Sequence, residues 1–289
     1  MERGGLTMKI LILGGDERQR KLGKLFLRDG YDVTCFTDEY EAEKLKESLK
    51  ESSAVILPLP VSRDGVTVYS DKELPIPIET VIGEMNSGKT LFGGIIRDNL
   101  KEKLAETNIP YFDYYADEAF VGFNAYLTAQ CALRLMLENT DEYLVSKRVL
   151  VTGFGRVAKA LASLLKRNGL DVYVAARNET QKATAYALGY KVLDIYDLGS
   201  VIRIFDFTLN TVPHRVFGER EVSLMKDGSL YIELASKPYG AKPEHFEKHG
   251  KRYFPAASLP GKYCSQSAAE AIYRSITKHI PTDGGEEDV

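Results

Sequence analysis

The sequence predicts an α/β protein with two Rossmann-like, doubly wound parallel-sheet domains joined by a long helix. Three observations support this fold class. Short apolar runs of strand length alternate with amphipathic helical patterns in both halves of the chain. Residues 149–177 contain a strand, a Gly-rich turn, a helix and a second strand in succession. The helical stretch at residues 125–137 is apolar on most of its surface, as expected for a buried connecting helix.

The first half, residues 8–117, is predicted to form a domain of flavodoxin-like character. Its strand-length apolar runs show little alternation, which is typical of parallel strands covered on both faces. We expect strands at residues 9–14, 31–36, 54–59, 90–92 and 111–113. We expect helices at residues 18–30, 41–49 and 99–106.

The connecting helix is assigned to residues 118–145 and the second Rossmann domain to residues 146–263. After the Gly-rich turn, further strands are expected at residues 191–193, 204–209, 229–233 and 252–254. A final helix within residues 264–280 is expected to pack back on the first domain. The tail of residues 281–289 is acidic and nearly free of apolar side chains, which predicts disorder.

The composition favours small-molecule chemistry. The chain has 289 residues, 44% apolar content and a formal net charge of −3, whereas nucleic-acid and anionic-membrane binders carry basic surfaces. We therefore expect neither partner. Cys35, Cys131 and Cys264 are widely spaced and form no zinc pattern, so no metal site is predicted and a reducing cytoplasm is indicated. No signal peptide or transmembrane segment is expected.

The turn after the strand at residue 149 has the spacing of a dinucleotide-binding site. Gly153 would permit the tight bend, Gly155 would let a pyrophosphate approach the backbone, and Ala158 would let the helix pack closely on the sheet. The phosphates would then bind at the helix N-terminus, together with Phe154, Arg156 and Val157. The alternative is a structural strand–helix–strand unit without a ligand.

Arg177 ends the second strand of this unit, where NAD-binding versions carry an acidic residue that binds the ribose hydroxyls. An arginine at this place favours the 2′-phosphate of NADP. We therefore predict NADP as the cofactor, with Arg177 and Asn178 contacting it. An exposed arginine that merely ends a strand is the alternative.

Ligands of such sheets bind beyond the carboxyl ends of the strands, so the loops there are candidate sites. In the first half, Gly15, Asp16 and Arg18 are predicted to bind an anionic substrate at a helix N-terminus. Simple capping of that helix by Asp16 is the alternative. Ser62, in the loop of residues 60–63, is also predicted to contact substrate. This loop and residues 86–89 provide either anion contacts or plain turns.

In the second half, one loop follows a buried strand and should lie under the nicotinamide ribose. Its predicted cofactor contacts are Asn210, Thr211, Val212 and Pro213. Leu259 and Pro260, in a later loop expected near the cleft between the domains, are assigned to the cofactor as well.

Candidate catalytic and substrate residues also lie in this half. Lys237 is a candidate substrate cation and catalytic residue, Lys262 a candidate substrate cation, and Thr128 a candidate substrate contact on the connecting helix. Both lysines could instead be ordinary surface residues. His214 follows the Asn-Thr-Val-Pro turn and is a candidate acid or base, or a solvent-facing side chain.

Six segments occur in an order that resembles the A subunits of dipicolinate synthase, the sporulation enzyme of Firmicutes: LGGDERQ, GFGRVA, VAARN, LNTVP, ELASKPYG and SLPGKY. The resemblance spans about residues 9–278. It implies a two-domain architecture like that of the 2-hydroxyacid dehydrogenases, and oxidation of dihydrodipicolinate to pyridine-2,6-dicarboxylate with NADP. It also implies that the partner is a flavoprotein-like B subunit and that the location is the mother-cell cytoplasm. We further expect a homo-oligomer.

The chain departs from the family at two places. Leu127–Cys131 stands where the family has Pro-Thr-x-Glu-Gly, and Gln130 cannot accept a proton as a glutamate would. Lys237 replaces an arginine, so a bidentate grip on a carboxylate becomes a point-charge contact. The substrate of the family carries two carboxylates, for which Arg18, Lys237 and Lys262 are the candidate cations. Because oxidation yields an aromatic ring, a modest base suffices.

Two other functions remain open. One is a related 2-hydroxyacid or shikimate-type dehydrogenase, although the sequence shows no convincing histidine with a paired acid near the last strand, nor a Lys/Asp pair in the first domain. The other is a non-catalytic NADP-binding partner or sensor, which the Gln130 substitution would permit.

Overall fold

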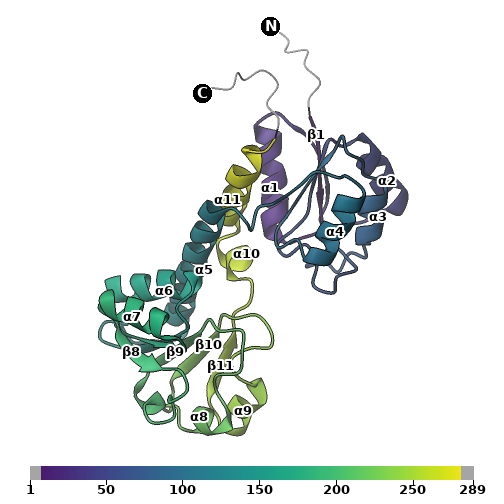
Figure 1. The fold of residues 1–289 in the computed structure, drawn as a ribbon. Helices are drawn as coiled ribbons and strands as arrows, with labels where there is room; N and C mark the ends of the chain where they lie inside the picture. Colours follow the sequence, from purple (N-terminus) through teal and green to yellow (C-terminus); the bar gives the residue numbers. More distant parts are fainter. Residues whose placement is uncertain (1–7, 281–289) are drawn as a thin grey trace. The chain divides into compact units, whose positions relative to one another are not determined.

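The computed structural model describes residues 8–280, and the chain divides into two compact units. The first comprises Met1–Phe123 and Cys264–Val289, and the second Asn124–Tyr263. The acidic tail expected at residues 281–289 lies outside the described residues. Figure 1 shows a parallel sheet with helices in each unit. The predicted fold class, two Rossmann-like α/β domains, is confirmed.

The first unit contains a five-stranded parallel sheet in the order β2-β1-β3-β4-β5. This order reverses direction between β1 and β3, as in flavodoxin-like folds. The strands are β1 (Lys9–Leu13), β2 (Asp32–Phe36), β3 (Ala54–Ile56), β4 (Thr90–Gly93) and β5 (Tyr111–Asp113).

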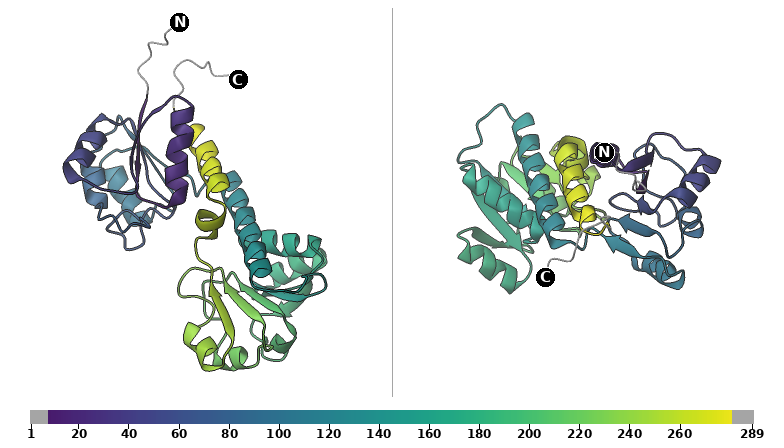
Figure 2. Two further views of the ribbon diagram at one scale, coloured as in Figure 1. Left: turned by 180° about the vertical axis from the view of Figure 1, so that it is seen from behind. Right: turned by 90° about the horizontal axis from the view of Figure 1, so that it is seen from above.

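Helices cover both faces of this sheet (Figure 1). One face packs on α2 (Ala42–Glu51), α3 (Ile78–Gly83) and α4 (Asp98–Glu106). The other packs on α1 (Glu17–Arg28), the start of α5 (Glu118–Glu138) and α11 (Ser265–Thr277). In both views of Figure 2, α1 and α11 lie side by side. The last helix therefore completes the core of the first unit.

The second unit contains a six-stranded parallel sheet in the order β11-β10-β9-β6-β7-β8, which reverses between β6 and β9. Its strands are β6 (Arg148–Thr152), β7 (Asp171–Ala176), β8 (Lys191–Asp194), β9 (Phe207–Asn210), β10 (Leu230–Glu233) and β11 (Arg252–Pro255). One face packs on α6 (Arg156–Arg167) and α7 (Glu179–Ala187), and the other on α8 (Glu219–Ser223) and α9 (Pro243–Lys248).

The structure corrects two predicted boundaries and one predicted loop. The connecting helix α5 ends at Glu138 instead of residue 145, because the Asn139 side chain donates to the Leu135 carbonyl oxygen and the chain turns. Strand β9 begins at Phe207, since Ile202–Ile204 forms the 3₁₀ turn η1. Residues expected as a loop form the short helix α10 (Leu259–Tyr263). Among residues 8–280, no helix combines the length and apolar character needed to span a bilayer.

Candidate functional site

Each sheet has one point where the strand order reverses, and in doubly wound folds this is where ligands bind. In the second unit it lies between β6 and β9, so the loops after these strands face one another across it. In the first unit it lies between β1 and β3. The predicted site residues follow these strands and their neighbours.

The β6–α6 turn has the geometry that a dinucleotide needs. Gly153 has a φ of +85°, and a Cβ atom there would lie 2.8 Å from Thr211 Oγ1 and 2.9 Å from Val212 Cγ2. Gly155 is the N-cap of α6 and provides no capping side chain, while a Cβ atom there would meet nothing within 4 Å. The first turn of α6 thus offers backbone N–H groups beneath open space, which suits a pyrophosphate.

The residues around this turn divide between packing and exposure. Phe154 is buried and Val157 half-buried, so the Phe154 side chain serves the core and only its backbone belongs to the turn. Ala158 is fully buried against the sheet, as the spacing predicted. Arg156 is exposed at the first position of α6.

Arg177 directly follows β7 and is exposed. The nearby acids are engaged elsewhere, since Lys182 Nζ lies 2.6 Å from Asp194 and 3.0 Å from Glu179. Within residues 8–280, Arg177 forms no ion pair. Asn178 uses its side chain to cap α7, accepting from the Gln181 amide at 2.8 Å. The strand end therefore presents a cation where a ribose 2′-phosphate would be placed.

The loop after β9 is fixed by a buried amide. Asn210 is fully buried, and its side-chain oxygen accepts from Thr152 Oγ1 and from the Val212 amide. Its Nδ2 group donates to the Val212 carbonyl oxygen at 2.9 Å. Asn210 therefore shapes the loop from inside, and Thr211, Val212 and Pro213 are the predicted residues left to face a cofactor.

Sequence reasoning missed Glu233, the last residue of β10, which is only 1% exposed. Its carboxyl group accepts from Asn210 Nδ2 at 2.6 Å, Tyr231 OH at 3.0 Å and the Gly240 amide at 2.8 Å. The Ala235 amide is a fourth donor at 3.2 Å. Burial raises the pKa of Glu233 even though these hydrogen bonds oppose the shift. An acid ending an otherwise apolar strand was the available signal.

This carboxyl group ties the loop after β9 to the loop after β10. Gly240 has no room for a side chain, because a Cβ atom would lie 2.3 Å from Asn210 Nδ2 and 2.7 Å from Tyr231 OH. The amides of Val216 and Phe217 both donate to the Gly240 carbonyl oxygen at 2.9 Å. The candidate catalytic side chains His214 and Lys237 are exposed on these two loops.

The remaining predicted site residues of the second unit differ in exposure and in hydrogen bonding. Thr128 Oγ1 donates to the Asn124 carbonyl oxygen at 2.8 Å, so its hydroxyl bonds within α5. Gln130 is exposed, with its Nε2 3.5 Å from Tyr126 OH. In α10, Leu259 and Pro260 are buried and Lys262 is exposed.

In the first unit, Asp16 and Arg18 bind one another. Arg18 Nε and Nη2 each donate to a carboxylate oxygen of Asp16 at 2.8 Å, and Nη2 also donates to the Leu59 carbonyl oxygen at 2.8 Å. Arg18 is 4% exposed. Burial alone would raise the pKa of Asp16, but the hydrogen bonds and charge of Arg18 hold it below its ordinary value. Most of the Arg18 fork is thus occupied within the protein.

The turn before α1 is also closed. Gly14 N donates to the Phe36 carbonyl oxygen, and Gly15 N donates to that of Tyr69 at 2.6 Å. Asp16 caps α1 in a full capping box with Gln19. The structure thus shows the capping role of Asp16, and both glycine amides already have partners.

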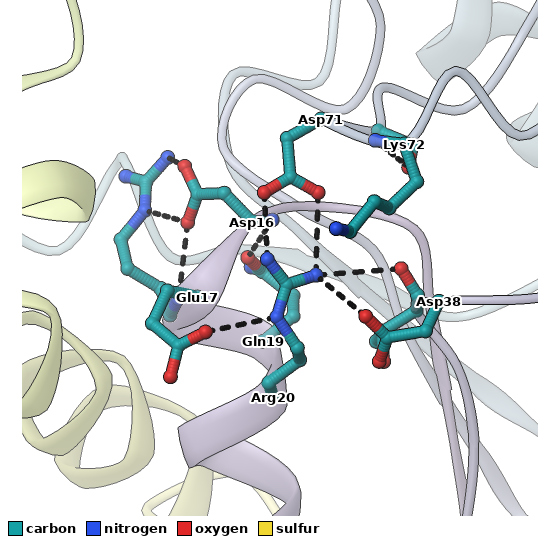
Figure 3. Close-up of polar contacts among 10 residues, drawn as sticks. Asp16, Glu17, Gln19, Arg20, Asp38, Asp71 and Lys72 are labelled. Carbon is teal, nitrogen blue, oxygen red and sulfur yellow. Dashed lines mark hydrogen bonds and ion pairs between the residues drawn. The ribbon is translucent and has the colours of Figure 1, made fainter.

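Figure 3 shows how the same turn is tied to its neighbours. Arg20 Nε lies 2.9 Å from Glu17, while its terminal nitrogens lie 2.6 Å from Asp71 and 3.4 Å from Asp38. These contacts join the start of α1 to the segments after β2 and β3. The charged side chains beyond the carboxyl end of β1 are therefore paired with one another and held rigidly.

Two further loops were predicted as anion contacts or turns. Ser62 Oγ donates to Asp64 at 2.9 Å and accepts from the Gly65 amide at 2.8 Å, so the hydroxyl organises its own loop. Lys89 is buried and donates to the carbonyl oxygens of Leu49 and Lys50 at the end of α2. Residues 86–89 are therefore a structural turn. Within residues 8–280, no group of three or more His, Cys, Asp or Glu residues is placed to hold a metal.

Comparison with known families matches each unit. Residues 9–115 match the family of N-terminal domains from the A subunit of dipicolinate synthase. Residues 131–237 match the D-isomer specific 2-hydroxyacid dehydrogenase NAD-binding domain. This match supports a nicotinamide-dinucleotide-binding dehydrogenase domain in the second unit, and hence an oxidoreductase.

Individual relatives extend the match along the chain. The A subunit of dipicolinate synthase from Bacillus subtilis is 23% identical, over 97% of this chain and 98% of the relative. The crystal structure of the corresponding protein from Bacillus halodurans superposes with a TM-score of 0.78 at 23% identity, covering 96% and 99% of the two chains. D-lactate dehydrogenase of Escherichia coli superposes with a TM-score of 0.66 at 13% identity, covering 93% and 95%. The resemblance and the predicted architecture are confirmed.

Proposed function

We propose that this chain, which is similar to the A subunit of dipicolinate synthase along nearly its whole length, oxidises dihydrodipicolinate to pyridine-2,6-dicarboxylate with NADP⁺. The proposal rests on two features near the point where the strand order of the second unit reverses. An open, uncapped helix N-terminus follows Gly155, and an exposed Arg177 ends the next strand. The first suits a pyrophosphate and the second a 2′-phosphate.

The bound cofactor would supply the nicotinamide C4 atom that takes up the hydride. In this proposal the α6 amides and Arg156 hold the pyrophosphate, Arg177 holds the 2′-phosphate, and Thr211, Val212 and Pro213 line the nicotinamide ribose. Glu233 acts indirectly, because its hydrogen bonds fix the loops after β9 and β10. These residues orient the reactants, which is most of what an aromatising oxidation requires.

The substrate has two carboxylates, which require cations or N–H donors. Lys237 and Lys262 are exposed and are proposed to bind them, with Ser62 as a further contact. Arg18 is proposed to bind the substrate with the guanidinium N–H groups that Asp16 and Leu59 do not occupy. The reaction removes one hydride and one proton from the ring, giving pyridine-2,6-dicarboxylate, NADPH and H⁺. His214 is the proposed proton acceptor, and its exposed position lets it pass the proton to water.

We also propose that the chain forms a homo-oligomer and works with a flavoprotein-like B subunit in the mother-cell cytoplasm. This arrangement is expected for a relative of this kind. The full chain should therefore be assayed with and without such a partner.

A second candidate is a 2-hydroxyacid dehydrogenase, favoured by the match of residues 131–237. Such an enzyme needs a histidine paired with an acid beyond the carboxyl ends of the strands, where the ligands bind. The His249–Glu219 pair, at 3.2 Å, involves a histidine between α9 and β11, at the amino ends of the strands. This position argues against the second candidate. A non-catalytic NADP-binding role, suggested by Gln130, predicts cofactor binding without turnover.

The deciding experiment supplies the purified full chain with dihydrodipicolinate and either NADP⁺ or NAD⁺, with and without a B-type partner. We expect pyridine dicarboxylate absorbance to appear faster with NADP⁺. A parallel assay offers 2-hydroxy acids. Product from 2-hydroxy acids alone would support the second candidate, and NADPH binding without any turnover would support the non-catalytic role.

A further inference from the structure

A pocket of about 250 Å³ lies within the first unit, beyond the carboxyl ends of β3 and β4. The loops after these two strands and residues of α3 and α4 line it. Its apolar lining includes Val61, Ile78 and Leu100, and its polar lining includes Ser62 and Asn99. Small-molecule sites are typically apolar cavities with a few polar groups in fixed positions. This pocket has that composition.

The wall formed by the loop after β3 is held rigidly. Asp64 accepts from the amides of Val66 and Thr67 at 2.8 Å and from Thr67 Oγ1 at 2.7 Å. Ser62 Oγ donates to the same carboxylate. The loop therefore keeps its shape without a ligand, and a preformed site loses less conformational entropy on binding.

The wall formed by the loop after β4 contains backbone strain. Ile95 has a φ of +60°, in the left-handed region that a β-branched residue rarely adopts. Asp113 holds it there, because its two carboxylate oxygens accept from the amides of Ile95 and Ile96 at 3.0 and 2.9 Å. The Ile95 side chain lines the pocket and is 41% exposed. Strain of this kind is often retained at ligand sites.

The charges of the lining leave one cation uncompensated. Lys103 and Glu79 bind one another at 2.9 Å and cancel. Arg97 also lines the pocket, and within residues 8–280 it has no carboxylate partner. Arg97 Nη2 donates a hydrogen bond to the Arg63 carbonyl oxygen at 3.3 Å. The guanidinium is thus available for a bidentate contact with an anion.

We propose that this pocket binds a small organic carboxylate with an apolar body, its carboxylate paired with Arg97 and its body against Val61, Ile78 and Leu100. Nothing in this inference depends on the nicotinamide cofactor. The ligand chemistry is shared by the proposed pyridine dicarboxylate product and by an unrelated aromatic carboxylate. The test has to separate these two sources.

The experiment is calorimetric titration of the full chain, without cofactor, using benzoate, pyridine-2,6-dicarboxylate and inorganic phosphate as probes. The variants are Arg97→Gln and, as a matched control, Arg63→Gln. Arg63 lies beside the pocket, but its guanidinium stacks 4.0 Å from the Tyr69 ring centre and it does not line the cavity. The control keeps the carbonyl oxygen that Arg97 contacts.

We expect at least one aromatic carboxylate to bind, with about tenfold weaker binding in Arg97→Gln and unchanged binding in Arg63→Gln. Tighter binding of the pyridine dicarboxylate would identify the product as the ligand, and equal binding of benzoate a broader carboxylate site. Binding of phosphate alone, no binding at all, or binding that Arg97→Gln leaves intact would overturn the proposal. Failure here leaves the proposed oxidation standing, because Ser62 is the one proposed substrate contact that lines this pocket and Lys237, Lys262 and Arg18 do not.

Discussion

Replacing Glu233 by glutamine tests whether one buried carboxyl group holds the cofactor loops. The carboxyl accepts from four donors, two at each oxygen. A glutamine that keeps its oxygen toward Asn210 and Ala235 places its NH₂ group toward Tyr231 OH, which can rotate, and the Gly240 amide, which cannot. At least one buried N–H then loses its acceptor, which costs about 1–3 kcal/mol.

Hydrogen exchange of the full chain measures this cost locally. Amides of β9 and β10 in the Glu233→Gln variant should open more easily by about 1–3 kcal/mol, while those of β1 and β3 serve as an internal control and stay unchanged. Tyr231→Phe removes one donor and leaves the carboxylate, so its effect should be about 0.5–1.5 kcal/mol. Equal protection of β9 and β10 in Glu233→Gln and the wild type would refute this role.

Three further predictions concern other parts of the two units. Gly155→Ala should change the free energy of unfolding by less than about 0.5 kcal/mol and weaken NADPH binding, whereas Gly153→Ala should lower the free energy of unfolding by more than about 1 kcal/mol. Denaturation and cofactor titration measure these two effects. A larger loss of stability in Gly155→Ala than in Gly153→Ala would contradict the turn geometry. Asp16→Asn leaves Arg18 buried without its carboxylate and should cost about 3–5 kcal/mol at neutral pH. Because the pKa of Asp16 is lowered on folding, the stability difference between the wild type and Asp16→Asn should shrink as pH falls below about 4. Acid denaturation of both proteins measures this difference, and a difference that stays constant with pH would contradict the prediction. Lys237→Ala should raise KM or lower kcat for the substrate without changing NADPH affinity, and an effect on NADPH affinity alone would show that its loop serves the cofactor.

The sequence was sufficient to predict the sheets and the dinucleotide turn, because these depend on local patterns. Apolar strand runs and the helical spacing after Gly155 both act over a few residues. Short helices such as α3, α8 and α9 escaped prediction, since six or fewer residues carry little periodicity. Tertiary packing, not propensity, stabilises elements of this length.

The side-chain pairings could not be predicted because they depend on residues far apart in the chain or on side-chain direction. Arg18 was assigned to a substrate, yet its fork closes on Asp16 and reaches Leu59. Glu233 meets Asn210, 23 positions earlier. Arg97 joins a pocket whose other wall begins at Val61. Such partners are defined only once the sheet brings the loops together.

The affinity of the full chain for NADPH and NADH, in the wild type and in Arg177→Asp, tests the central claim most directly. Arg203→Asp is the control, because Arg203 is exposed in η1, before β9 and away from the carboxyl ends of the strands. We predict that the wild type prefers NADPH by about tenfold or more, and that Arg177→Asp alone removes this preference. Equal affinity of the wild type for both cofactors, or a preference that survives Arg177→Asp, would contradict the account.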